Sequence, residues 1–235
     1  MPRNKNTFQA LSDTEVLVLS SDGRLWLEHA PFGTVPPIRQ QVDASVSAFQ
    51  ALSDTEVLVL VSDNKLWLEH APFGTVPPAR QQVDASVIAF QALSDSEVFV
   101  LGADGNLWLE HAPFGTAPPT RQHVDTSVRD FQALSDTQVL VLATDGNLWL
   151  EQGPYGTVPP PRQQVDSGVS AFQSLSGTTV LVLGSNGKLS VEHALTPLGH
   201  YLPALYFAYN TGGPQVETVS TDFNTVLKAS SIRSA

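Results

Sequence analysis

The chain has 235 residues and a formal net charge of -11, with 12 Lys and Arg against 23 Asp and Glu. An acidic surface repels phosphate backbones and anionic lipids, so we expect no nucleic-acid partner. No apolar run approaches the roughly 18 residues of a membrane-spanning helix, so we expect no membrane insertion. The absence of cysteine excludes disulfides and thiolate chemistry. Because the start MPRNKNTFQAL also lacks an apolar leader, the expected location is cytoplasmic or leaderless-secreted, and the compartment is otherwise open.

The first predicted element is a hairpin over residues 15–30, EVLVLSSDGRLWLEHA. A run of β-forming residues precedes Asp22-Gly23, and a second run starts at Leu25. Asp-Gly between two such runs favours a type I′ turn, in which both central residues have positive φ. The sequence therefore predicts two antiparallel strands joined at Asp22-Gly23.

The hairpin belongs to a unit of 41 residues that recurs along the chain. Each copy begins with FQAL or FQSL, and copies 8–48 and 49–89 differ at only five positions. The predicted near-identical repeats are 8–48, 49–89, 90–130 and 131–171, followed by a degenerate repeat 172–200 and an eroded sixth unit 201–235. All of them are assigned to one domain, 1–235.

The sixth unit is inferred from an alignment of the tail. Residues 215–230, QVETVSTDFNTVLKAS, align without a gap on residues 15–30, and residues 206–209 take the place of FQAL. The alternative interpretation is a ring of five units followed by a packed C-terminal tail.

Each unit is expected to form four short strands. In the second copy they are predicted near residues 46–52, 56–60, 65–70 and 80–83. The linker APFGTVPP between the third and fourth strands is rich in turn formers, and the chain shows no convincing helical stripe. Repeated units of about 40 residues with four strands each are typical of a β-propeller. The sequence thus predicts an all-β propeller, with six blades preferred and five blades plus a tail as the alternative.

Four positions in each unit are candidate ligand-binding positions: a Trp on the third strand, a Glu two residues later, an aromatic residue in the PFG or PYG loop, and a single Arg. The candidate ligand-binding residues are Trp26, Glu28, Phe32, Arg39, Trp67, Glu69, Phe73, Arg80, Trp108, Glu110, Phe114, Arg121, Trp149, Glu151, Tyr155 and Arg162. The Trp position becomes Ser190 and Val226 in the last units, which supports a stacking platform as an alternative to packing between blades.

Each of these positions also has a structural interpretation. In this interpretation the Trp side chains would pack between blades, because a Trp buries up to about 250 Å². The Glu side chains would form a polar rim at exposed strand ends. Each Arg would pair with an acidic residue of its own blade, and would not hold a ligand through its guanidinium fork. The loop Phe or Tyr is a hydrophobic plug under its loop, or else part of a pocket.

Metal binding and catalysis have little support in the sequence. Glu28 and His29 are neighbours on a strand and point to opposite faces, and HxH or HExxH spacing is absent. Asp22 is explained by its turn and Asp43 by capping of a loop, and the acidic residues lack calcium-loop spacing. Near-identical copies argue against one asymmetric catalytic site. We therefore predict no enzyme, no catalytic residue, no metal and no cofactor.

The segments VLSSDGRLWLE (18–28) and VLGADGNLWLE (100–110) resemble the blade hairpins of β-propeller lectins, of tachylectin-like and fungal or bacterial types. The resemblance covers residues 8–194. It implies shallow sites between adjacent blades, each built from an aromatic residue, an acidic or amide group, and backbone; Trp26, Glu28 and their repeats occupy the matching positions. The expected function is multivalent carbohydrate binding, with glycans or glycoproteins as partners.

Two other functions stay open. The first alternative is a protein–protein interaction scaffold that docks partners on the face of the ring or on the divergent tail. The second is a lyase or hydrolase with a site in the central channel. The sequence does not determine the sugar, the number of active sites or the oligomeric state.

Overall fold

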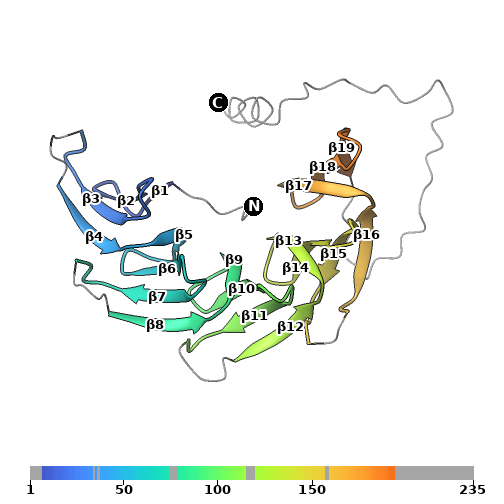
Figure 1. Ribbon diagram of the computed structural model, residues 1–235, viewed down its shortest axis with the longest axis horizontal. Helices are drawn as coiled ribbons and strands as arrows, with labels where there is room; N and C mark the ends of the chain where they lie inside the picture. The colour runs from blue at the N-terminus through green and yellow to red at the C-terminus, as the bar shows by residue number, and fades with distance from the viewer. Residues whose placement is uncertain are drawn as a thin grey trace.

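The computed structural model describes residues 7–33, 35, 38–74, 79–114, 120–156 and 159–193. In this part of the chain, 19 β-strands form five antiparallel sheets, and no helix is long and apolar enough to cross a membrane. The sheets follow one another around an arc in chain order (Figure 1). The first strand of each sheet lies toward the inside of the arc, and the fourth strand of each four-stranded sheet lies outermost (Figure 1). This radial arrangement is that of a β-propeller, so the predicted fold is confirmed.

Each sheet is one blade built from strands in sequence order. The first two blades contain β1 (Phe8–Ala10), β2 (Glu15–Leu19), β3 (Leu25–His29), β4 (Arg39–Asp43), β5 (Val46–Ala51), β6 (Glu56–Val61), β7 (Leu66–His70) and β8 (Ala79–Asp84). The third and fourth contain β9 (Val87–Ala92), β10 (Glu97–Gly102), β11 (Leu107–His111), β12 (Arg121–Asp125), β13 (Val128–Ala133), β14 (Gln138–Ala143), β15 (Leu148–Gln152) and β16 (Arg162–Asp166). The fifth contains β17 (Val169–Ser176), β18 (Thr179–Gly184) and β19 (Leu189–His193).

The four strands predicted for the second copy are confirmed to within one residue at each end by β5 to β8. The predicted sixth unit, 201–235, and the end of the degenerate repeat beyond His193 lie outside the described residues. The sixth blade and the assignment of the whole chain to one domain therefore remain predictions.

The hairpin turns differ from the predicted type I′ geometry. Gly23 has a φ of 79°, but Asp22 is not among the residues with positive φ. The Gly23 amide donates to the Ser20 carbonyl at 3.0 Å, so residues 20–23 form a β-turn with the glycine in its last position. Asp22 accepts from the Ser20 hydroxyl at 2.6 Å and the Arg24 amide at 3.2 Å, which holds its own backbone out of the left-handed region.

The hydrophobic core consists of layers between adjacent blades. Cross-strand pairing places Leu58 opposite Leu68 and Val57 opposite Glu69, so alternate residues point to opposite sides of the sheet. We call the side with Leu58, Leu60, Leu66 and Leu68 the Leu face, and the side with Phe49, Val57 and Val59 the Phe face. Each of the four core clusters joins the Leu face of one blade to the Phe face of the next. A blade in the middle of the arc is therefore covered on both sides.

A glutamine on the innermost strand connects each blade to the next. The Gln50 amide donates to the Ala92 carbonyl at 3.1 Å, and its oxygen accepts from the Ala92 amide at 2.9 Å. We call this two-bond contact the Gln clamp. It recurs from Gln9 to Ala51 and from Gln91 to Ala133, and Gln132 accepts from the Ser174 amide at 2.8 Å. The clamp fixes the height of one blade relative to the next, because both polar groups of a single residue are bound.

Candidate binding site at the blade junctions

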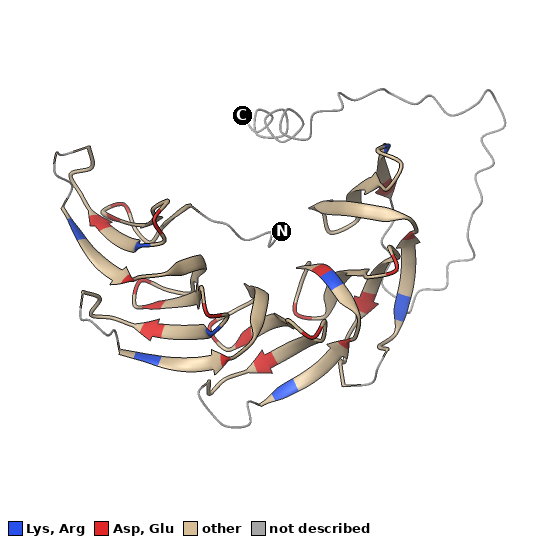
Figure 2. Ribbon diagram, in the orientation of Figure 1, with Lys and Arg blue, Asp and Glu red and all other residues tan. Residues whose placement is uncertain are grey.

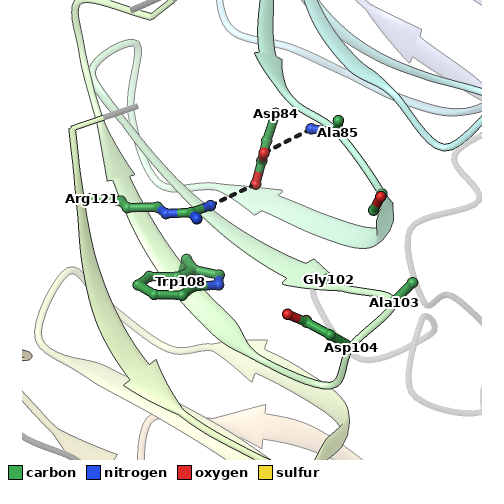
Figure 3. Close-up of a pocket in the computed structure, with 8 residues that line it drawn as sticks. Asp84, Ala85, Gly102, Ala103, Asp104, Trp108 and Arg121 are labelled. Atoms are coloured by element: carbon green, nitrogen blue, oxygen red, sulfur yellow. Dashed lines mark hydrogen bonds and ion pairs between the residues drawn. The ribbon is translucent and has the colours of Figure 1, made fainter. Parts of the chain in front are cut away.

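A pocket of about 460 Å³ lies at the junction of the second and third blades. One wall comes from the turn between β8 and β9, and the other from the β10–β11 hairpin and the two outer strands of the third blade (Figure 3). The lining residues are Asp84, Ala85, Ser86, Gly102, Ala103, Asp104, Trp108 and Arg121. The pocket therefore combines an aromatic ring, two carboxylates, a guanidinium group and the backbone of two turns.

Arg121 is the centre of this pocket. Its guanidinium carbon lies 4.0 Å from the centroid of the Trp108 ring, and its Nη1 lies 3.1 Å from Asp84 Oδ2 (Figure 3). The same nitrogen is 3.5 Å from Oε1 of Glu110 on its own blade. Arg121 thus stacks on an aromatic ring while bridging carboxyl groups from two blades, a geometry that a flexible lysine ammonium does not reproduce.

The same constellation occurs at two further junctions. Arg80 lies 4.2 Å from the Trp67 ring and 3.1 Å from Asp43. Arg162 lies 4.3 Å from the Trp149 ring and 3.3 Å from Asp125. Figure 2 shows the basic segments of this constellation on the outermost strands β4, β8, β12 and β16. Three consecutive junctions therefore carry equivalent sites.

Buried glutamates lie behind these arginines. Glu69, Glu110 and Glu151 are 0%, 1% and 0% exposed. Burial, reinforced by the neighbouring Asp of the preceding blade, raises the pKa of Glu69 to about 9, of Glu110 to about 8 and of Glu151 to about 9. As carboxylates, Glu69 and Glu151 find no hydrogen-bond donor for either oxygen. A bound proton makes each a donor to that Asp, which is a second cause of the raised pKa values.

The first and fifth blades carry incomplete versions of the site. Arg39 stacks on Trp26 at 4.0 Å and lies 3.8 Å from Glu28, but among the described residues no preceding blade supplies an Asp. In the fifth blade Ser190 stands at the Trp position. The complete constellation thus requires an Asp from one blade and the Trp–Arg pair of the next.

The structure places the sequence-predicted residues in three different environments. Trp108 and Arg121 line the pocket, whereas Glu110 and Phe114 are not among its lining residues. The interpretation of the glutamates as an exposed polar rim is wrong for Glu69, Glu110 and Glu151, because the adjacent blade covers them. The loop aromatics Phe73, Phe114 and Tyr155 are buried in the junction cores and act as plugs, while Phe32 is exposed.

The arginines show both expected and unexpected contacts. Pairing with a Glu of the same blade matches the structural interpretation. The pairing with an Asp of the preceding blade was not predicted. The Asp84 side chain also accepts from the Ala85 amide at 2.7 Å, so it serves its loop and the next blade at once. His123, whose ring stacks 4.4 Å from Trp108, is a further contact that sequence reasoning missed.

Comparison with known proteins supports the fold and no narrower class. No family model and no curated protein matches the sequence. The C-terminal WD40 domain of Sif2 superposes with a TM-score of 0.55 at 16% identity, over 79% of this chain and 54% of that one. The WD40 propeller of Doa1 gives 0.52 at 13% identity, over 78% and 62%. The computationally designed Ika8 protein gives 0.50 at 19% identity, over 79% and 57%.

These likenesses define the chain as a β-propeller of the general architecture seen in WD40 domains. The chain spans a little more than half the length of these structures.

Proposed function

We propose that this chain is a non-catalytic binding propeller that engages its partners at the blade junctions. The supporting observation is the repetition of one Trp–Arg–Asp constellation at three consecutive junctions, with Arg–Asp distances of 3.1, 3.1 and 3.3 Å. Catalysis is normally performed by one asymmetric set of groups. Equivalent weak sites suit multivalent binding, in which avidity exceeds the affinity of one site by about 10²–10⁴.

Fold and charge favour a protein with an exposed basic segment as the partner. In this proposal the chain acts as a scaffold for protein–protein interaction. The chain carries a net charge of -11, and the pocket places Asp84 and Asp104 beside Trp108. Because Arg121 already stacks on Trp108 and pairs with Asp84, an incoming cationic side chain would be bound mainly by Asp104. The architecture of WD40 domains is compatible with such a scaffold.

Carbohydrate binding is a second candidate function, favoured by the composition of the pocket. Trp108 offers an apolar ring edge, and the Asp84–Arg121 pair offers an acceptor and a donor 3.1 Å apart, a spacing suited to adjacent sugar hydroxyls. A neutral glycan would not be repelled by the acidic chain. This ligand class is also the one implied by the resemblance of the hairpins to propeller lectins.

The two functions are separated by paired arrays of basic peptides and neutral glycans, probed with the full chain at about 0.15 M salt. The test variant carries Asp63→Asn, Asp104→Asn and Asp145→Asn, which remove pocket charge but keep an acceptor for the turn amides. Asp22→Asn is the matched control, because its blade lacks the complete site. Binding to either array that falls at least tenfold in the triple variant and not in the control supports the junction sites.

The array that responds identifies the partner. Peptide binding that weakens with added salt indicates the scaffold, since surface charge interactions are screened. Salt-insensitive glycan binding indicates the carbohydrate function. Binding to neither array, or binding that the triple variant leaves unchanged, contradicts the proposal that these junctions are the binding sites.

A further inference from the structure

The two ends of the arc expose apolar faces that are buried at every inner junction. Phe8 on the Phe face of the first blade is 71% exposed, whereas its equivalent Phe49 is 0% exposed. Val191 on the Leu face of the fifth blade is 45% exposed, whereas its equivalent Leu150 is 1% exposed. These two blades lie at opposite ends of the arc (Figure 1). The exposure is partial, because Leu181 on the Leu face of the fifth blade is only 6% exposed.

The exposed faces are the two halves of one interface that the chain builds four times. Each inner junction joins a Leu face to a Phe face. The fifth blade keeps a Leu face of Leu181, Leu183, Leu189 and Val191, and the first blade keeps a Phe face of Phe8, Val16 and Val18. The two ends of the arc therefore carry the equivalents of the apolar residues that pack together at the inner junctions.

The Gln clamp shows the same complementarity. Gln173 stands where Gln50 and Gln91 stand in earlier blades, but no described residue hydrogen-bonds its side chain. Ala10 stands where Ala51 and Ala92 stand, and no glutamine of the described chain reaches its amide and carbonyl. One end thus retains the donor half of the clamp, and the other end retains the receiving half.

We propose that the Leu face of the fifth blade binds the Phe face of the first blade of a second copy of this chain, head to tail, with Gln173 clamped on Ala10 of that copy. The complement of each open face is present on the chain itself. Residues 194–235 contain no FQAL or FQSL segment and only one glutamine, Gln215, so the inner-junction sequence itself is not repeated there. This contact is heterologous, which produces a closed ring or an extended assembly.

The proposed contact also gives the first blade the neighbour it lacks. Trp26, Glu28 and Arg39 face the side on which a preceding blade lies at the inner junctions. A second copy seated on this face covers the exposed Phe8 and Phe32. The inference is independent of the partner class proposed for the junction pockets.

The test is the molar mass of the full chain, measured by light scattering and sedimentation over a wide range of concentrations. We expect association into multiples of 25.2 kDa that strengthens with concentration. Gln173→Ala and Phe8→Ser should each weaken association by about tenfold or more, because each removes contacts worth about 1.4 kcal/mol or more. Gln122→Ala, on an exposed outer strand, is the control and should not change it.

A mixing experiment distinguishes head-to-tail contact from any symmetric contact. Phe8→Ser leaves the Leu face intact, and Gln173→Ala leaves the Phe face intact. An equal mixture should therefore form mixed dimers through one undamaged interface, although each variant alone associates poorly. Far-UV circular dichroism establishes that both variants are folded, and if Phe8→Ser fails, Phe8→Gln takes its place.

Three results would overturn the proposal. A mass of 25.2 kDa at every concentration means that residues 194–235 or other parts of the same chain cover the open faces. Association that both variants leave unchanged places the contact elsewhere. Variants that associate no better when mixed than alone exclude the head-to-tail arrangement.

Discussion

The inner junctions and the open ends of the arc contain the same sequence in different environments. Residues 8–19 and 49–60 are identical, yet Phe8 is exposed and Phe49 is fully buried. Glu28 is partly exposed, whereas Glu69 is completely covered. Burial in this propeller is therefore a property of a pair of neighbouring blades. Stability is expected to behave as it does in repeat proteins, with separate contributions from each unit and each interface.

The largest expected contrast comes from truncating equivalent phenylalanines. Phe90→Ala opens a cavity in the core between the second and third blades and should cost about 3–5 kcal/mol of unfolding free energy. Phe8→Ala removes an exposed ring and should cost less than about 0.5 kcal/mol. Urea denaturation at low protein concentration measures both values. Equal losses would show that Phe8 is covered in solution.

The buried glutamates should make stability depend on pH. Glu69, Glu110 and Glu151 have a folded-state pKa of about 8 to 9 against 4.5 for the ordinary side chain, so the folded chain holds protons that the unfolded chain releases. Stability should therefore fall as pH rises from about 5 to about 9, by about 1.4 kcal/mol per pH unit for each glutamate at most.

Glutamine variants test this pH dependence through urea midpoints. Replacing the three buried glutamates by glutamine should flatten the dependence, because the amide stays neutral. Glu28→Gln, in the first blade, is the control and should leave the slope unchanged. A slope that survives the triple substitution would assign it to other groups.

Loss of a Gln clamp should have a smaller effect. Gln91→Ala removes two hydrogen bonds to Ala133 and should cost about 1–3 kcal/mol. Gln173→Ala, at the open end, should leave the stability of the monomer within about 0.5 kcal/mol of the original. Thermal or urea unfolding of both variants provides the comparison. A large loss for Gln173→Ala in the monomer would mean that its amide is already bound.

The smallest contrast is expected for the stacked arginines. Arg121→Lys keeps the charge but loses the planar contact with Trp108 and the fixed geometry of the guanidinium nitrogen beside Asp84. We expect a loss of about 1 kcal/mol. Arg39→Lys also loses a planar contact, with Trp26, but it has no Asp partner in the described chain, so it should cost less than Arg121→Lys. Similar values for both would indicate that the inter-blade ion pair contributes nothing measurable.

The repeat period and local turn chemistry were sufficient to predict the propeller and its strands. The turn type was predicted incorrectly, because the hydrogen bonds of Asp22 to Ser20 and Arg24 select a different turn with the same Asp-Gly pair. Local signals of this kind act within a few residues and are visible in the sequence.

The chemistry of the junctions was harder to predict because it depends on pairs of residues far apart in the chain. Arg80 and Asp43 are 37 positions apart and belong to different blades. Asp43 was predicted to cap its loop, and it does accept a hydrogen bond from the Ala44 amide. This local role gave no reason to expect a second partner, Arg80, on the next blade. Strand alternation shows that Glu69 shares a face with Trp67, but it does not show that another blade covers that face.

The Gln clamp has a consequence for how such a chain changes in evolution. The Gln side chain hydrogen-bonds to backbone groups of a residue in the next blade. These groups are present whatever side chain the residue carries, as Ala92 and Ser174 illustrate. Duplication or deletion of a whole 41-residue segment therefore creates new neighbours that already fit, without compensating substitutions. The number of blades can change by unequal recombination while each interface stays intact, in keeping with copies 8–48 and 49–89, which differ at only five positions.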